Sequence, residues 1–330
     1  MNKKFDLKKL TSSREMSLVI VLIVMCAFIQ IRNTTFLNIA NVNDLLVNAS
    51  ILSILALGMM CVLLIAGIDI SIGSTLALSG MVTGLVMRDH PGVPTIVLFG
   101  IAILVGLVGG LIIGVVVAKG NVIPIIATLG FMNIYRGATY LVANNQWIAA
   151  YQVPEGFKAF TLGKIGPFNN MIIVAAICYI LFGYCMKFTK IGRKIYAVGS
   201  NAEAAKISGI NIDRIKLLVY SLMGALCGLC GGLWVSKYAS AQGDAAKGIE
   251  MDVIAACVIG GVSLNGGKGT VLGVLLGSIT IGILNNALPL INVSSFWQDA
   301  IKGLIIIAAI ILNVVTQRTM DRNNLKRREM

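Results

Sequence analysis

The chain has 330 residues, of which 57% are hydrophobic and only 12% are charged, and it carries a formal net charge of +13. Soluble domains carry about 25% charged residues. The composition therefore excludes a soluble enzyme or binding module and predicts an all-α polytopic membrane protein. The basic residues lie at the ends of apolar segments, where they contact anionic lipid and set orientation, so no nucleic-acid partner is expected.

Ten apolar segments have a length suited to crossing a membrane. They are 16–31, 45–68, 70–87, 93–118, 122–143, 170–186, 216–236, 252–264, 270–289 and 297–313. The segment 252–264 is too short to cross unaided, and we expect a half-helix or re-entrant piece whose ends are buried by protein. No small-residue cleavage site follows 16–31, which predicts a retained first helix.

The distribution of charge predicts how these spans are oriented. Most of the 27 Lys and Arg residues lie in the N-terminal tail 1–15, in a polar segment at 192–216 and in the basic tail 314–330. Cytoplasmic loops of membrane proteins are enriched in Lys and Arg. We therefore expect about ten transmembrane helices, cytoplasmic N- and C-termini and one membrane domain over 16–313.

An acidic residue interrupts the join between the second and third spans, AGIDISIGS, where Asp69 stands between two apolar runs. An acid at membrane depth is costly and is a functional candidate by default. The alternative, which we favour, is that Asp69 or Ser71 caps the third span by accepting hydrogen bonds from free helix amides.

Polar residues also interrupt the run ATLGFMNIYRGATYLVANNQ, where Asn133 and Tyr135 either line a pathway or bond across helices. Arg136 is expected to reach the outer interface. On chemistry alone, the candidate pathway residues are polar groups within apolar spans. They are Asn48, Ser53, Asn133, Tyr135, Asn285 and Asn286.

The longest loop expected outside, residues 144–169, contains Trp147, Tyr151, Phe157 and Phe160. Two interpretations stay open. The loop either meets something delivered to the outer surface or anchors the chain at the membrane interface.

A polar island, residues 192–216, reads GRKIYAVGSNAEAAKISGINIDRIK. Ser200-x-x-Glu203 fits a capping box and Gly209 a helix stop, which together predict a helix of about two turns. So short a helix is marginal alone and needs a partner to pack on. The alternative is an ordinary ordered connector.

Glycines recur every four residues in three stripes, which begin at Gly106, Gly224 and Gly269. Such stripes let helix backbones approach closely, either within a tight bundle or at a dimer face. The sequence GGKGT is no phosphate loop, because glycine follows Lys268 and Val262 occupies the first glycine position. We expect a tight cytoplasmic turn there.

Patterns typical of catalysis are missing from the sequence. The seven cysteines lie in apolar segments, and neither GxSxG nor HExxH occurs. We therefore expect no enzyme activity, no catalytic residue, no metal and no cofactor. With Asp69 as the one plausible buried acid, the proton relay of a secondary carrier is poorly supplied.

Four stretches, in this order, resemble the permease subunits of bacterial ABC sugar importers of the ribose/xylose/arabinose class. They are GIDISIGS at 67–74, TLGFMNIYRG at 128–137, GRKIYAVGSNAEAAKISGI at 192–210 and SLNGGKGT at 263–270. The resemblance extends over about residues 16–315. Branched-chain amino-acid permeases of the same superfamily match these stretches less well. The family usually has glycine at the position of Ser200, a mild departure.

The resemblance implies a multi-pass protein of the bacterial inner membrane that forms a pore with a second permease subunit, as a homo- or heterodimer. A separate cytoplasmic ABC ATPase docks beneath, and an extracytoplasmic binding protein delivers a monosaccharide, a ribose-like pentose or related hexose. The alternative cargo is a branched-chain amino acid, a nucleoside or a furanosyl signalling compound. The helix at about 199–209 is then the coupling helix that contacts the ATPase. Its expected coupling residues are Gly199, Ser200, Asn201, Glu203, Ala204, Ala205 and Gly209.

Overall fold

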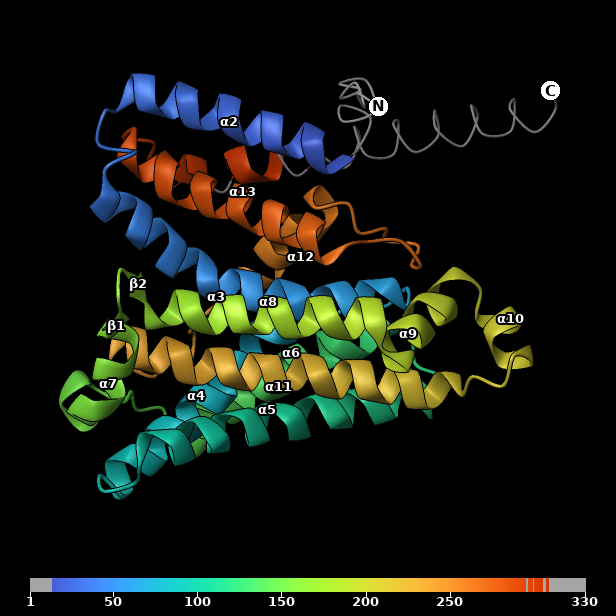
Figure 1. The fold of residues 1–330 in the computed structure, drawn as a ribbon. Helices are drawn as coiled ribbons and strands as arrows, with labels where there is room; N and C mark the ends of the chain where they lie inside the picture. Colours follow the sequence, from blue (N-terminus) through green and yellow to red (C-terminus); the bar gives the residue numbers. More distant parts are fainter. Residues whose placement is uncertain (1–13, 295, 299, 305–306, 309–330) are drawn as a thin grey trace, which may run out of the picture.

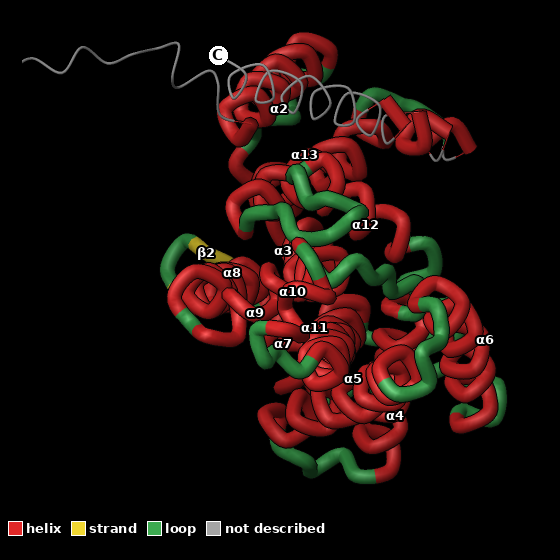
Figure 2. The backbone as a smooth tube through the Cα atoms, turned by 90° about the vertical axis from the view of Figure 1, so that its right-hand side faces the viewer, coloured by secondary structure: helices red, strands yellow, loops and turns green. Residues whose placement is uncertain are grey.

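The computed structural model describes residues 14–294, 296–298, 300–304 and 307–308. The long helices of this part lie side by side in an elongated bundle (Figure 1), and Figure 2 views them nearly end-on. The predicted tails 1–15 and 314–330 lie outside the described residues apart from two positions, as does much of the predicted span 297–313.

Eight helices of 18 residues or more form the described bundle. They are α2 (Arg14–Arg32), α3 (Ile39–Leu64), α4 (Ile72–Asp89), α5 (Thr95–Ala118), α6 (Pro124–Val142), α8 (Asn170–Phe188), α11 (Ile212–Tyr238) and α13 (Val271–Leu290). Among the described residues, five of these helices are long and apolar enough to cross a membrane, namely α3, α5, α8, α11 and α13. Strand is confined here to one short hairpin, so the prediction of an all-α membrane protein is confirmed.

Side-chain caps fix where several helices begin. The Asn38 side chain accepts from the Ala40 amide at α3, and Asn169 and Asn211 do the same for α8 and α11. Thr270 accepts from the Gly273 amide at α13. Each cap satisfies an amide that would otherwise lack a partner at a helix start.

Glycine stripes hold α5 against α11, the most extensive helix pair of the described chain. A Cβ built on Gly106 would lie 2.6 Å from the Gly228 amide nitrogen, and one on Gly110 would lie 2.9 Å from Gly224. The third stripe packs differently, with Gly273 against Gly260 at the end of α12. The stripes are therefore used within the chain, and the dimer-face alternative is wrong for them.

Two irregular segments run into the bundle. The helix that follows each of them begins inside the bundle. Residues 65–71 join α3 to α4, and residues 239–248 join α11 to α12 (Ile249–Ile259). A Cβ on Gly73 would lie 2.7 Å from the carbonyl oxygen of Ala246, so the second segment packs on the first turn of α4. With 11 residues and a length of about 16 Å, α12 cannot span a bilayer. It agrees with the predicted half-helix, and its residues from Val253 onward are mostly buried.

The predicted outer loop is an ordered cap on one end of the bundle. It contains the 3₁₀ turn η1 (Ala150–Gln152), α7 (Glu155–Leu162) and the antiparallel strands β1 (Lys164–Ile165) and β2 (Phe168–Asn169). The Ser236 hydroxyl, near the end of α11, donates to the Phe157 carbonyl of α7. The other end of α11, about 40 Å away along its axis, follows the polar island (Figure 1).

Candidate functional site

The polar island folds into two helices where the sequence predicted one. They are α9 (Lys190–Ser200) and α10 (Ala202–Ile207), which protrudes at the end of the bundle opposite α7 (Figure 1). Thr189 caps α9 by accepting from the Gly192 amide at 3.2 Å. The buried residues Ile195 and Val198 lie three positions apart, so one face of α9 packs on the bundle.

Both ends of α10 are capped within the chain. The predicted capping box is wrong in its residue, because Ser200 belongs to α9 and the extended Asn201 accepts from the Ala204 amide at 3.0 Å. At the other end, Gly209 has a φ of +79° and its amide donates to Lys206, while the Ile210 amide donates to Ala205. These two bonds form a Schellman motif, which confirms Gly209 as the helix stop.

The exposed surface of α10 defines what this helix presents to solvent. Glu203 and Ala204 are exposed, whereas Ala205 is buried against the bundle. Ile207 is 88% exposed at the tip of the helix. Ile207 is not among the residues predicted from the sequence, although an exposed apolar residue at the end of so short and polar a helix is a signal that can be read there.

Backbone contact joins α9 to two other parts of the chain at what we call the glycine junction, formed by Leu64, Gly199, Gly266 and Gly267. The Gly267 amide donates to the Leu64 carbonyl at 2.9 Å. A Cβ on Gly199 would overlap that same carbonyl oxygen, and one on Gly266 would lie 2.9 Å from the carbonyl oxygen of Gly199. Gly266 and Gly267 both have positive φ, so the tight turn predicted at GGKGT is confirmed.

A side-chain bond reinforces the glycine junction. The Tyr196 hydroxyl donates to the Gly269 carbonyl at 2.7 Å. Burial raises the pKa of the Tyr196 phenol, so the hydroxyl keeps its proton at neutral pH. The third and fourth of the sequence stretches noted above are therefore held together here.

Asp69 orders the turn just before α4, but neither it nor Ser71 accepts from an amide within the helix, as the favoured capping role required. It is 2% exposed, and its carboxylate accepts from the Ser71 amide at 2.9 Å and from the Ser71 hydroxyl at 2.6 Å. The Thr128 hydroxyl of α6 donates to the neighbouring Ile68 carbonyl at 3.3 Å. The first and second sequence stretches therefore also lie in contact.

Four of the predicted pathway residues make bonds typical of helix packing. The Tyr135 hydroxyl is buried and donates to the Gly109 carbonyl at 2.7 Å, and Asn286 pairs with Asn41 of α3 at 3.1 Å. The Ser53 hydroxyl and the Asn133 amide bond to carbonyls of their own helices. These polar groups already have partners in the chain.

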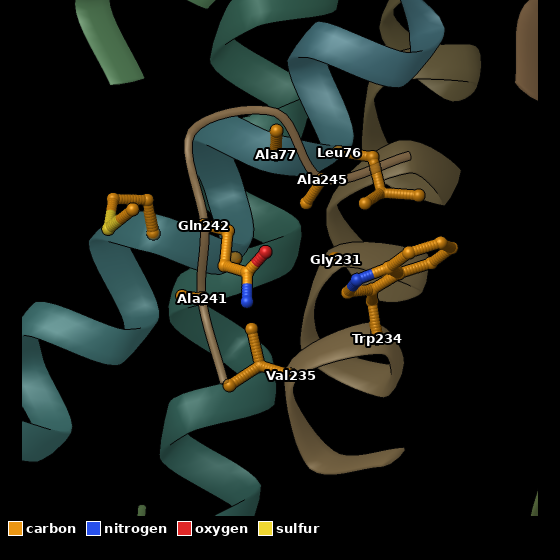
Figure 3. A pocket seen from close by; sticks show the side chains of 10 residues that line it. Leu76, Ala77, Gly231, Trp234, Val235, Ala241, Gln242 and Ala245 are labelled. Carbon is orange, nitrogen blue, oxygen red and sulfur yellow. The ribbon is translucent and has the colours of Figure 1, made fainter. Parts of the chain in front are cut away.

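The Arg136 side chain, which we expect at the outer interface, binds backbone carbonyls within the chain. Its guanidinium donates to the carbonyls of Gly243 at 2.8 Å and Ala245 at 2.9 Å. It therefore holds the segment 239–248, whose buried carbonyls need donors. A narrow crevice lies between this segment and helices α4 and α11, lined by Leu76, Gln242 and Trp234 (Figure 3).

Asn48 and Asn285, the other two predicted pathway residues, line one cavity of about 800 Å³. The Asn285 amide donates to the Asp252 carboxylate at 3.1 Å, and the Lys237 ammonium donates to the Asn48 side chain. The sequence analysis missed Lys237 and Asp252, because charges near the ends of apolar segments look like interfacial anchors.

The aromatic residues of the outer cap divide into two groups. Phe157 and Phe160 pack on Phe99 at ring-centroid distances of 5.0 and 4.8 Å, whereas Trp147 is 65% and Tyr151 86% exposed. Of the four aromatic residues singled out from the sequence, Trp147 and Tyr151 thus remain available for either role predicted for this loop, and Phe168 of β2 is exposed as well. Among the described residues, no group of His, Cys, Asp and Glu has the arrangement of a metal site.

An all-helical bundle in which five described helices are long and apolar enough to cross a membrane defines a multi-pass membrane protein. The comparisons place it more closely. A family model for the permease component of the branched-chain amino acid transport system matches residues 41–310, and the chain belongs to this family.

Similar proteins include import permeases named for ribose, for galactose and methyl galactoside, and for autoinducer 2. The chain is 37% identical over 301 residues to the ribose import permease protein RbsC of Escherichia coli, covering 91% of this chain and 93% of the relative. It is 34% identical over 331 residues to the galactose/methyl galactoside import permease protein MglC of Haemophilus influenzae, covering 94% and 96%. The autoinducer 2 import system permease protein LsrC of Yersinia pseudotuberculosis is 29% identical over 323 residues, covering 96% and 89%.

The chain is thus a multi-pass inner-membrane protein of the ribose/xylose/arabinose class of ABC sugar permeases. No solved structure matches it.

Proposed function

We propose that this chain is the membrane-spanning permease subunit of an ATP-binding-cassette importer that moves a monosaccharide, a ribose-like pentose or related hexose, across the inner membrane. The observation that carries the proposal is its 37% identity to a ribose import permease over 91% of the chain. The protruding, capped helix α10 supports it, since such a helix suits a transport subunit moved by a partner.

The helix α10 is the part that contacts the ATPase in this proposal. The exposed residues Glu203, Ala204 and Ile207 form its contact surface, and the small alanine side chains let it enter a groove. Gly199 acts behind it at the glycine junction, which joins α9 to the end of α3 and to the turn before α13. Movement of α10 therefore passes to two membrane helices through backbone contacts. ATP hydrolysis resides on the separate subunit.

The proposed topology has about ten membrane crossings within one domain over 16–313, with both termini in the cytoplasm. The basic residues of the island, Arg193, Lys194, Lys206, Arg214 and Lys216, support a cytoplasmic α10. The cap with Trp147 and Tyr151 then faces outward, where an extracytoplasmic binding protein delivers the sugar. A second permease subunit completes the pore.

Reconstitution tests the proposal. Proteoliposomes containing this chain, its ATPase and its binding protein should take up radiolabelled ribose or galactose only when ATP is supplied. Uptake by this chain alone under an ion gradient would replace the proposal with a secondary carrier.

A substitution on α10 tests the coupling assignment. Ala204→Trp places a bulky ring on the contact surface, and we expect sugar uptake to fall at least about tenfold while the subunit still folds. The matched control, Ala204→Ser, should keep the wild-type rate. An Ala204→Trp variant with normal uptake would show that α10 is not the coupling helix.

The alternative function is that the same permease scaffold imports another compound. This cargo would be a branched-chain amino acid, a nucleoside or a furanosyl signalling compound. The relationship to an autoinducer 2 permease favours keeping the last of these. Competition of unlabelled compounds against labelled ribose in the same proteoliposomes decides between them.

A further inference from the structure

We infer that the 800 Å³ cavity between α3, α11, α12 and α13 binds a neutral monosaccharide transiently during its transport. The side chains that bind the sugar there are those of Asn48, Lys237, Asp252 and Asn285. The inference rests on the proposed function and adds the residues that touch the sugar within the membrane domain.

The position of the cavity suits a pathway. Asn48 lies 16 residues before the end of α3 at Leu64, and Lys237 lies at the far end of α11 from the polar island. The cavity therefore occupies the half of the bundle that carries the cap with α7. Its volume exceeds that of a monosaccharide, so a sugar fits with water around it.

The polar groups in the cavity form two hydrogen-bonded pairs, and a sugar hydroxyl can replace one partner in each pair. Lys237 donates to Asn48, and Asn285 donates to Asp252. The other amide atom of Asn285, Oδ1, is buried and has no hydrogen-bond partner in the described chain. A buried acceptor without a donor costs free energy, and a hydroxyl donor from a ligand would satisfy it.

Aromatic rings supply the apolar part of the subsite. The rings of Trp234 and Tyr238 lie 4.7 Å apart between centroids, and the Lys237 ammonium lies 4.9 Å from the Tyr238 centroid. Small-molecule sites combine such apolar surfaces with a few placed polar groups. One face of a sugar ring is apolar and its hydroxyls are polar, which matches this combination.

The chemistry of the cluster favours a neutral polyhydroxyl ligand. Each sugar hydroxyl both donates and accepts, so it can serve the Lys237 donor and the Asp252 acceptor alike. Lys247 and Lys302 also line the cavity, so its charge alone does not exclude an anion, and the choice of a neutral cargo rests on the matching of donors and acceptors. The internal pairs satisfy most polar groups of the empty subsite and leave Asn285 Oδ1 for the ligand, so a sugar gains few new hydrogen bonds and binds weakly.

Paired substitutions in the full transporter test the inference. Asn285→Ala removes the orphan acceptor, and Asp252→Asn keeps the shape of the side chain while removing its charge. The control is Asn286→Ala, on the next residue of α13, whose side chain bonds to Asn41 instead. Proteoliposomes with ATPase and loaded binding protein report the uptake of ribose and of galactose, together with the stimulated ATPase rate.

We expect both cavity variants to lower sugar uptake about tenfold and to change the ribose-to-galactose uptake ratio, with stimulated ATPase activity kept. Asn286→Ala should keep the wild-type ratio. The inference is overturned if both cavity variants keep the wild-type rate and ratio, if Asn286→Ala changes the ratio equally, or if the wild type prefers leucine or a phosphorylated sugar. A wild type without any ATP-dependent sugar uptake would instead overturn the proposed function.

Discussion

The glycine junction and the cavity lined by Asn48 and Asn285 are both places where separate helices meet, but they are built in opposite ways. At the junction, Gly199 and Gly267 press backbone against the Leu64 carbonyl, and there is no room for a methyl group. In the cavity, polar side chains such as those of Lys237 and Asp252 line about 800 Å³ of open space. Backbone contact suits the transfer of movement, because it cannot yield without the helices moving. Side-chain pairs suit transient binding, because they can exchange partners.

Of the substitutions that test this comparison, the one at Gly199 should have the largest effect on stability and transport. Gly199→Ala puts a Cβ onto the Leu64 carbonyl, so we expect a loss of about 3 kcal/mol or more of stability together with the loss of transport. Thermal unfolding in detergent and uptake by proteoliposomes measure the two effects. Gly130→Ala on α6 is the matched control, since its Cβ meets nothing within 4 Å. Equal behaviour of the two variants would show that the junction tolerates side chains.

The α5–α11 contact extends the same comparison to a pair of long helices. Gly110→Ala would place a Cβ 2.9 Å from the Gly224 backbone and should cost about 2 kcal/mol, seen as a lower thermal midpoint. Gly100→Ala, on the same helix but facing open space, should leave the midpoint unchanged or raise it. A reversed order of the two midpoints would contradict the packing of α5 on α11.

Tyr196→Phe weakens the glycine junction without touching a glycine. It removes the donor to the Gly269 carbonyl, and we expect a loss of about 1 kcal/mol and a moderate fall in uptake per ATP hydrolysed. The ratio of sugar transported to ATP hydrolysed is the measurement. An unchanged ratio with a lower midpoint would limit Tyr196 to a role in stability.

Among these substitutions, the one in the cavity, Asn48→Ala, should have the smallest effect on stability. Asn48 is exposed, so Asn48→Ala should change the free energy of unfolding by less than about 0.5 kcal/mol. The same variant should alter which sugar is preferred, because the Lys237 ammonium loses its partner. A loss of stability as large as that of Gly110→Ala would mean that the cavity is part of the packed core.

The sequence alone predicts features that depend on local pattern. Membrane-length apolar runs, the glycine stripes, the stop at Gly209 and the turn at Gly266 and Gly267 all appear in the structure. Each follows from the intrinsic preferences of a few neighbouring residues. Which stripe packs on which, by contrast, depends on contacts between distant segments and was left open.

The finer details of the site depend on competition that a sequence does not display. Ser200 and Asn201 are both suitable caps, and Asn201 caps α10 because α9 extends through Ser200. Asn285 and Asn286 are chemically identical neighbours, but they lie about 100° apart around α13. One therefore lines the cavity and the other pairs with Asn41.

The pairing of α5 with α11 also has a consequence for how the protein is made. About a hundred residues separate Ala118 from Ile212, so α5 leaves the ribosome long before its partner is synthesised. Until then its glycine face is exposed to lipid. Among the described spans α5 is the most apolar, which allows it to remain inserted alone during this interval. A strongly hydrophobic helix thus suits an element that stays in the lipid until the partner of its most extensive contact is made.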